Sequence, residues 1–166
     1  MTKSVDSTPS GDPVEAIRNY YGRMPRMSDW FTVTQEMIDQ FGRATCDSDW
    51  IHTNPERARL ESPYGTPIAH GFWTLSMLTH LSRETQGADY PPGALVGINY
   101  GFERVRFPGP VPIGLRIRLH SKLIDITARD GNRYLIRTEN TIEVENQSKP
   151  AVVAEWLFLL VYPAEN

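Results

Sequence analysis

The chain has 166 residues, of which 40% are apolar, and this is enough for one globular domain with an ordinary core. Lys and Arg number 17 against 20 Asp and Glu, so the net charge of -3 excludes the basic surface typical of nucleic-acid binding. The longest apolar run, Trp156 to Tyr162, is too short to cross a membrane. A single cysteine, Cys46, excludes an internal disulfide and favours a cytoplasmic protein.

The N-terminal part predicts a tail and then a helix. Residues 1–12 lack the apolar core of a secretory signal and are expected to form a flexible tail, with one domain over residues 13–166. Pro13 to Met24 carries apolar residues at helical spacing, Asp12 is suited to cap it and Pro25 to end it.

A short strand, a second helix and a long loop are expected next. The strand covers residues 30–33, and Thr34 is a suitable N-cap for a half-buried helix from Gln35 to about Ala44. Residues 45–67 are expected to be irregular, apart from a possible short helix at Pro55 to Leu60. A loop of this length inside a compact domain is uncommon unless it is functional.

Residues 71–84 predict a long helix that is apolar on nearly all sides, and therefore a buried one. The pattern then changes to alternation, which predicts strands over residues 95–107, from residue 115 to a turn at 130–132, and from 134 to 144. Residues 151–162 are apolar on both faces and predict a central strand. Helices followed by strands with short turns indicate an α+β fold, with an antiparallel sheet curled around the one buried helix.

The predicted loop holds the best candidates for chemistry. Asp47 and His52 form a carboxylate and imidazole pair suited to moving a proton, and Gly71 begins the long helix, where backbone N–H groups are free. Each has a simpler interpretation on its own. Asp47 is equally suited to a cap or turn, His52 taken alone is more typical of a hydrogen-bonded loop histidine, and Gly71 can simply permit close packing.

Several motifs occur together in an order that resembles a known family. They are Asp47-x-x-x-x-His52, Pro55-Glu56-Arg57-Ala58, Gly65-Thr66-Pro67-Ile68-Ala69-His70-Gly71-Phe72, Asn99-Tyr100-Gly101, Val105-Arg106-Phe107 and Pro110-Val111-Pro112-x-Gly114. Together they resemble the MaoC-like, or (R)-specific enoyl-CoA hydratase, family and in particular its NodN-like branch. The resemblance spans roughly residues 31–162.

This resemblance implies a hot-dog fold, a homodimer, and reversible hydration of trans-2-enoyl-CoA to (R)-3-hydroxyacyl-CoA without a metal or other cofactor. It implies that Asp47 and His52 are the catalytic pair and that the Gly71 N–H faces the thioester oxygen. Further positions expected at the substrate site are Trp50, His70, Phe72 and Thr79. His70 is also suited to a structural role at the helix start, and Thr79 to a core hydroxyl or to support of the pair.

The chain departs from the family pattern beside the aspartate. Cys46 stands where glycine is common and is expected to be a small buried filler, while Asp49 and Trp50 replace an Asn-Pro found in many members. Wide spacing of the four histidines, with no paired thiolates, predicts no metal site. Arginines that alternate along the strands are expected on the outer sheet face, with one or two near the coenzyme A phosphates.

Two other functions fit the same fold. A thioesterase would also place a carboxylate near a helix N-terminus, although the histidine five residues after Asp47 argues against it. A non-catalytic acyl-thioester-binding or assembly subunit is the second, and the intact pair argues against that. Acyl chain length, the choice between coenzyme A and an acyl carrier protein, and the direction of reaction stay open.

Overall fold

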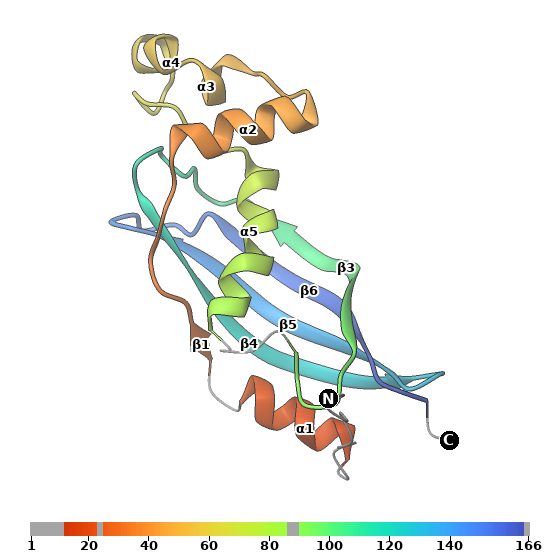
Figure 1. The fold of residues 1–166 in the computed structure, drawn as a ribbon. Coiled ribbons are helices and arrows are strands. Elements are labelled where there is room, and N and C mark those ends of the chain that lie inside the picture. The colour runs from red at the N-terminus through yellow and green to blue at the C-terminus, as the bar shows by residue number, and fades with distance from the viewer. Residues whose placement is uncertain (1–11, 23–24, 86–89, 165–166) are drawn as a thin grey trace, which may run out of the picture.

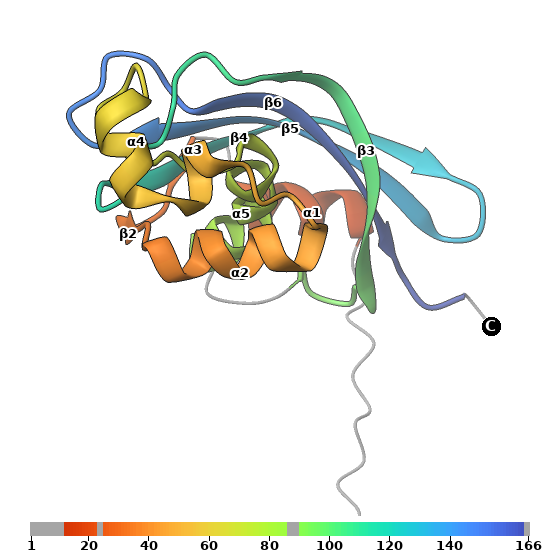
Figure 2. The ribbon, with the colours of Figure 1, turned by 90° about the horizontal axis from the view of Figure 1, so that it is seen from above.

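An antiparallel sheet curves around one long helix, α5 (Gly71–Glu84), in the computed structural model, which describes residues 12–22, 25–85 and 90–164. Figures 1 and 2 show the helix lying along the concave face of the sheet. This confirms the predicted α+β fold. The predicted tail, apart from Asp12, lies outside the described residues.

The sheet has six strands in the order β1-β4-β5-β6-β3, with β2 paired to β4 at one end. The predicted central position of β6 is confirmed, because β6 pairs with β5 on one side and β3 on the other. Sequence patterning missed the two-residue strand β1. The strands are β1 (Arg26–Met27), β2 (Phe31–Thr32), β3 (Val96–Arg106), β4 (Arg116–Arg129), β5 (Arg133–Val144) and β6 (Val152–Val161).

The first helix, α1 (Pro13–Tyr21), is shorter than predicted. Asp12 caps it as expected, since its Oδ1 accepts a hydrogen bond of 2.9 Å from the Val14 N–H. The predicted end at Met24 is wrong because Gly22 adopts a φ of 71°, a left-handed value that ends the helix.

Three helices lie between β2 and α5, and the first of them is the predicted helix from Gln35. They are α2 (Gln35–Thr45), α3 (Trp50–Thr53) and α4 (Pro55–Glu61). Within the segment predicted to be irregular, the short helix at Pro55 is confirmed as α4, whereas α3 was not predicted. Figure 1 shows the three helices stacked over the N-terminal end of α5, so they cover the place where its free N–H groups lie.

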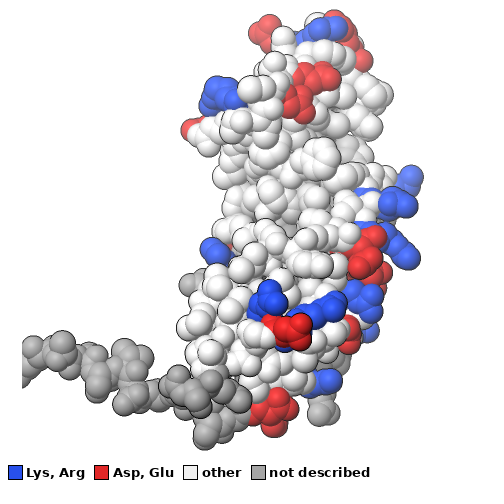
Figure 3. Space-filling model, turned by 90° about the vertical axis from the view of Figure 1, so that its right-hand side faces the viewer, with Lys and Arg blue, Asp and Glu red and all other residues white. Residues whose placement is uncertain are grey.

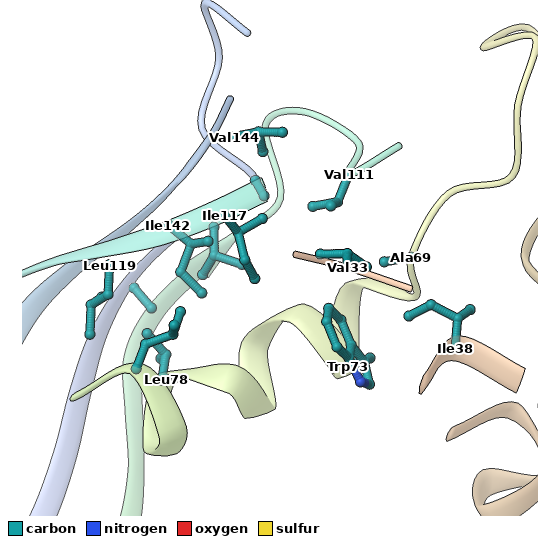
Figure 4. Packing of buried hydrophobic residues seen from close by; sticks show 14 residues of the cluster. Val33, Ile38, Ala69, Trp73, Leu78, Val111, Ile117, Leu119, Ile142 and Val144 are labelled. Atoms are coloured by element: carbon teal, nitrogen blue, oxygen red, sulfur yellow. The ribbon is translucent and has the colours of Figure 1, made fainter. Parts of the chain in front are cut away.

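The main core lies between α5 and the end of the sheet nearest α2. Trp73 and Leu78 of α5 pack against Ile117 and Ile142 of the sheet, and Ile38 joins them from α2 (Figure 4). A second cluster around Ile17, Ile136, Phe158, Leu160 and Tyr162 fixes α1 to the other end of the sheet. The first cluster holds α5 by its inner side.

The outer side of α5 is open, so the prediction of a helix buried all round was wrong. Phe72 is 72% exposed, whereas Trp73, Leu78 and Leu81 are buried. Apolar residues occur on nearly all sides of α5 because one face packs on the sheet, while the other face carries apolar residues at the surface. None of the helices in the described residues is long and apolar enough to cross a membrane.

Candidate active site

The end of α2 places Asp47. Cys46 adopts a φ of 58°, and the Asp47 N–H donates a 3.0 Å hydrogen bond to the Gly42 carbonyl, so the chain folds back under the helix. The Asp47 side chain is 53% exposed. Cys46 is exposed as well, so the prediction of a buried filler was wrong: a left-handed cap residue projects from the helix end.

Gly42 makes this turn possible. A Cβ atom at Gly42 would lie 2.7 Å from the Asp47 carbonyl oxygen and 3.6 Å from Cε1 of His70. Any side chain there would push Asp47 away from the histidine. Sequence analysis did not select Gly42, although a glycine inside a helix costs about 1 kcal/mol relative to alanine and so indicates a special packing requirement.

His52 lies in a helix and not in a loop. The four-residue helix α3 begins after Asp49, whose Oδ1 accepts a 3.2 Å hydrogen bond from the Ile51 N–H. Asp49 therefore has a role as the N-cap of α3, in addition to being exposed to solvent. At the other end, Gln35 of α2 donates a 2.7 Å hydrogen bond to the His52 carbonyl and holds α3 against α2.

The tautomer of His52 is set by a main-chain contact. Its Nδ1 lies 2.7 Å from the carbonyl oxygen of Ile68. Because a carbonyl can only accept, Nδ1 carries the hydrogen and the lone pair is on Nε2. His52 is thus arranged to take up a proton, or to hold a water molecule, at Nε2.

His70 links the two predicted catalytic residues. It is 2% exposed, its ring stacks on His52 with centroids 3.9 Å apart, and its Nε2 lies 3.1 Å from the carbonyl oxygen of Asp47. Nε2 is therefore the donor, and Nδ1 is buried without a hydrogen-bond partner among the described residues. Burial lowers the pKa of His70, so the ring is neutral near pH 7.

Asp47, His52 and His70 form one cluster, with potential ligand atoms within 4.8 Å of one another. The premise that wide sequence spacing keeps the histidines apart was therefore wrong. Nε2 of His70 uses its hydrogen on the Asp47 carbonyl, so a metal ion held through that nitrogen would require it to lose the bond. Absence of a metal cofactor stays a prediction.

Gly71 is the first residue of α5, directly after His70. His70 makes no side-chain cap, so the first N–H groups of the helix are available to a ligand. A Cβ atom at Gly71 would lie 3.3 Å from the Phe107 ring, which shows a close approach at this point. The predicted oxyanion position is therefore at the same end of α5 as the cluster, and Gly71, His52 and Phe107 line one hollow of about 240 Å³.

The other predicted substrate residues lie further out. Phe72 is on the open side of α5, and Trp50 lies at the start of α3 with the Arg57 guanidinium 4.4 Å from its ring centre. Thr79 is two turns further along α5, where it lines a separate hollow beside β6. The structure thus groups Asp47, His52, His70 and Gly71, but not Trp50 or Thr79, at one end of α5.

The predicted outer face of arginines includes several ion pairs. Arg116 pairs with Glu145, and Arg118 pairs with Glu143, while Arg137 is 3.9 Å from Glu155. These carboxylates engage the guanidinium groups, and Arg118 together with His120 lowers the pKa of Glu143. For the arginines outside these three ion pairs, contact of one or two with the coenzyme A phosphates stays a prediction.

Comparison with known proteins identifies the family. Residues 17–146 match the family model described as "MaoC like domain". The chain belongs to this MaoC-like family.

Two curated relatives of the MaoC-like chain are of similar length. 3-Hydroxyacyl-thioester dehydratase Z of Mycobacterium tuberculosis is 43% identical over 134 residues, which cover 81% of this chain and 86% of the relative. Nodulation protein N of Rhizobium leguminosarum is 41% identical over 135 residues, covering 81% and 83%. Family membership and the dehydratase relative support a hydratase or dehydratase.

The MaoC-like chain also shares its fold with solved hydratase structures. The (R)-hydratase from A. caviae superposes with a TM-score of 0.64 at 17% identity, over 84% of this chain and 95% of the other. The predicted hot-dog fold is thereby confirmed. The identity is too low for this structure to carry more than the fold.

Proposed function

We propose that this protein catalyses the reversible hydration of trans-2-enoyl-CoA to (R)-3-hydroxyacyl-CoA. The observation that carries the proposal is the pairing of His52 with Asp47 beside the N-terminus of α5. His52 has its hydrogen on Nδ1, held by Ile68, and therefore offers a basic Nε2 within the cluster that contains the Asp47 carboxylate. An imidazole nitrogen and a carboxylate of this kind can together bind and deprotonate one water molecule.

The reaction adds the elements of water across a double bond. As the water oxygen bonds to C3, the Asp47/His52 pair takes one proton from it, and the pair then returns a proton to C2. General acid–base catalysis of this kind contributes typically about 10²–10⁴-fold. His70 holds the main chain of Asp47 by its Nε2–H and, being neutral, places no positive charge against the ring of His52.

Negative charge develops on the thioester oxygen while C3 is attacked. The first N–H groups of α5, beginning at Gly71, supply donors with the positive end of the helix dipole behind them. A donor of this kind is worth about 3–4 kcal/mol when water is excluded. Gly71 lets a group approach the main chain closely, as Phe107 does in this structure.

A homodimer completes the proposal. An apolar surface runs from the open side of α5 onto β3, whose outer edge has no partner strand among the described residues. In Figure 3, which looks onto the side where β3 lies, a broad area without charged side chains lies between charged regions. Such an area is typical of an interface with a second copy. Its exposed apolar residues are Phe72, Leu95, Ile98, Tyr100 and Phe102.

The direct test is hydration of crotonyl-CoA and of longer trans-2-enoyl-CoA esters, followed by loss of the enone absorbance. We expect turnover by the wild type and a loss of at least about 10²-fold for Asp47→Asn and for His52→Gln. A matched control is Asp49→Asn, which keeps a capping side chain on α3 outside the cluster. Full activity of both site variants would refute the mechanism.

The same assay separates the alternative functions. A thioesterase would release free thiol from saturated acyl-CoA, which a thiol reagent detects. A non-catalytic subunit would bind acyl-CoA without converting it, and would elute from gel filtration as an inactive species until its partner is added. We expect neither result for the isolated protein.

A further inference from the structure

Two polar side chains lie on the inward face of a central strand. Along β5 the buried positions include Ile136 and Ile142, but between them stand Thr138 and Asn140, which are 2% and 1% exposed. Burial of polar groups between apolar neighbours is unfavourable unless each group has a hydrogen-bond partner. Their presence therefore needs a reason beyond packing.

The hydrogen bonds of this pair leave the Thr138 hydroxyl proton available. Nδ2 of Asn140 donates to the Thr138 oxygen, Oγ1, over 2.8 Å, so Thr138 accepts here and its own hydrogen is directed elsewhere. Oδ1 of Asn140 is buried with no partner among the described residues. The pair thus has unused hydrogen-bonding capacity inside the protein.

Thr138 forms part of the wall of a hollow of about 240 Å³ below the C-terminal half of α5. Aromatic rings of Tyr21, Tyr90, Trp156 and Phe158 line one part of the wall. Polar side chains line another part, and they come from three strands and the helix. One of them, Arg83 of α5, is charged, and the others are uncharged. The uncharged polar residues are Thr79, Ser82, Asn99, Ser121 and Thr138.

This hollow continues toward the N-terminal half of α5. A second hollow, lined by Phe72, Leu75 and Ser76, runs along the helix beside β3 and shares Thr79, Asn99 and Trp156 with the first. It begins at Phe72, the residue after Gly71, and Thr79 lies roughly 12 Å from Gly71 along the helix axis. The hollow that contains Gly71 and His52 shares no lining residue with these two, so an acyl chain whose thioester lies at Gly71 would reach Thr138 by passing over Phe72 on the outer side of α5.

We propose that this lower hollow is an acyl subsite for chains that carry a hydroxyl or keto oxygen near their far end. The inference rests on the proposed function. A plain alkyl tail would cover the hydroxyls of Ser121 and Thr138 and offer them no hydrogen bond, whereas an oxygenated tail bonds to them. A site built to hydrogen-bond a substrate oxygen discriminates strongly against the analogue that lacks it, which an apolar pocket cannot do.

The test compares trans-2-decenoyl-CoA with its ω-hydroxy derivative, with crotonyl-CoA as a substrate too short to reach the subsite. We expect kcat/KM for the ω-hydroxy ester to exceed that for the alkyl ester by about ten-fold or more. The variant Thr138→Val removes the hydroxyl at nearly constant shape and brings this ratio close to one. Thr141→Val, on the opposite face of the same strand, keeps the wild-type ratio.

The outcomes separate the inference from the function on which it rests. No hydration of any of the three esters refutes the proposed function. Hydration with equal rates for the two long esters, or with preference for the alkyl ester, refutes the oxygen-binding subsite alone. If Thr138→Val does not fold because Asn140 keeps only the Thr138 carbonyl as an acceptor, Ser121→Ala decides instead, since the Ser121 side chain has no hydrogen-bond partner among the described residues. An unchanged ratio in Ser121→Ala then refutes the subsite.

Discussion

The Nε2 atom of His70 lies 3.1 Å from the carbonyl oxygen of Asp47, so a buried ring holds the main chain that carries the exposed carboxylate. The same ring stacks on His52. One neutral histidine therefore fixes the separation of the two groups that bind the water in the proposed mechanism. His70 acts here as a positioning residue and does not need to touch the substrate.

Replacement of this ring tests that role. His70→Phe keeps a ring against His52 but removes the N–H donor, and we expect kcat to fall by about ten-fold with KM nearly unchanged, because a typical hydrogen bond contributes about 0.5–1.5 kcal/mol. His80→Phe is the matched control within α5, where the histidine is exposed near Glu84. Wild-type kcat in a folded His70→Phe protein would contradict the role.

Gly42 should be equally sensitive. In Gly42→Ala the new methyl group would lie 2.7 Å from the Asp47 carbonyl oxygen, so the turn at Cys46 must shift. We expect a loss of about 1–3 kcal/mol in the free energy of unfolding, measured by urea titration, and a lower kcat. Gly101→Ala adds the same group where no atom lies within 4 Å, and we expect a much smaller change in stability. Equal stability of the two variants would show that α2 adapts.

The buried His70 also predicts a pH dependence of stability. Burial lowers its pKa below the ordinary 6.5, so in the window between its folded pKa and 6.5 the unfolded chain binds more protons than the folded protein. The contribution of neutral His70 to the free energy of unfolding is complete above pH 6.5 and is lost as the pH falls through that window. We expect the Tm of the wild type to fall more steeply from pH 7 to pH 5 than that of His70→Phe. Parallel curves would exclude a contribution from His70.

The apolar edge strand gives a prediction on assembly. Tyr100→Lys places a charge on the exposed apolar area of β3, and we expect it to convert the dimer to a monomer in size-exclusion chromatography with light scattering. Ile124→Lys, at an exposed apolar position on β4, should leave the dimer intact. A wild-type protein that is monomeric at micromolar concentration would refute the homodimer itself.

Much of the fold follows from local patterns. Alternation along residues 115–144 predicted β4 and β5, and the turn at 130–132 is present with Gly131 and Asn132 at φ values of 71° and 54°. These features depend on neighbours in the chain. Helix α3 was missed because its four residues give no periodic signal, and its start depends on Asp49 as a cap.

The sequence by itself determined the α+β order, the strand alternation and, through its motifs, the candidates Asp47, His52 and Gly71. Only the tertiary structure decided that His70 joins Asp47 to His52, that Gly42 is needed for the turn, and that Thr138 lines a hollow. Motif spacing measures distance along the chain. The chemistry depends on atoms that come together only when α2, α3 and the start of α5 pack against one another, and on which main-chain carbonyl each imidazole nitrogen meets.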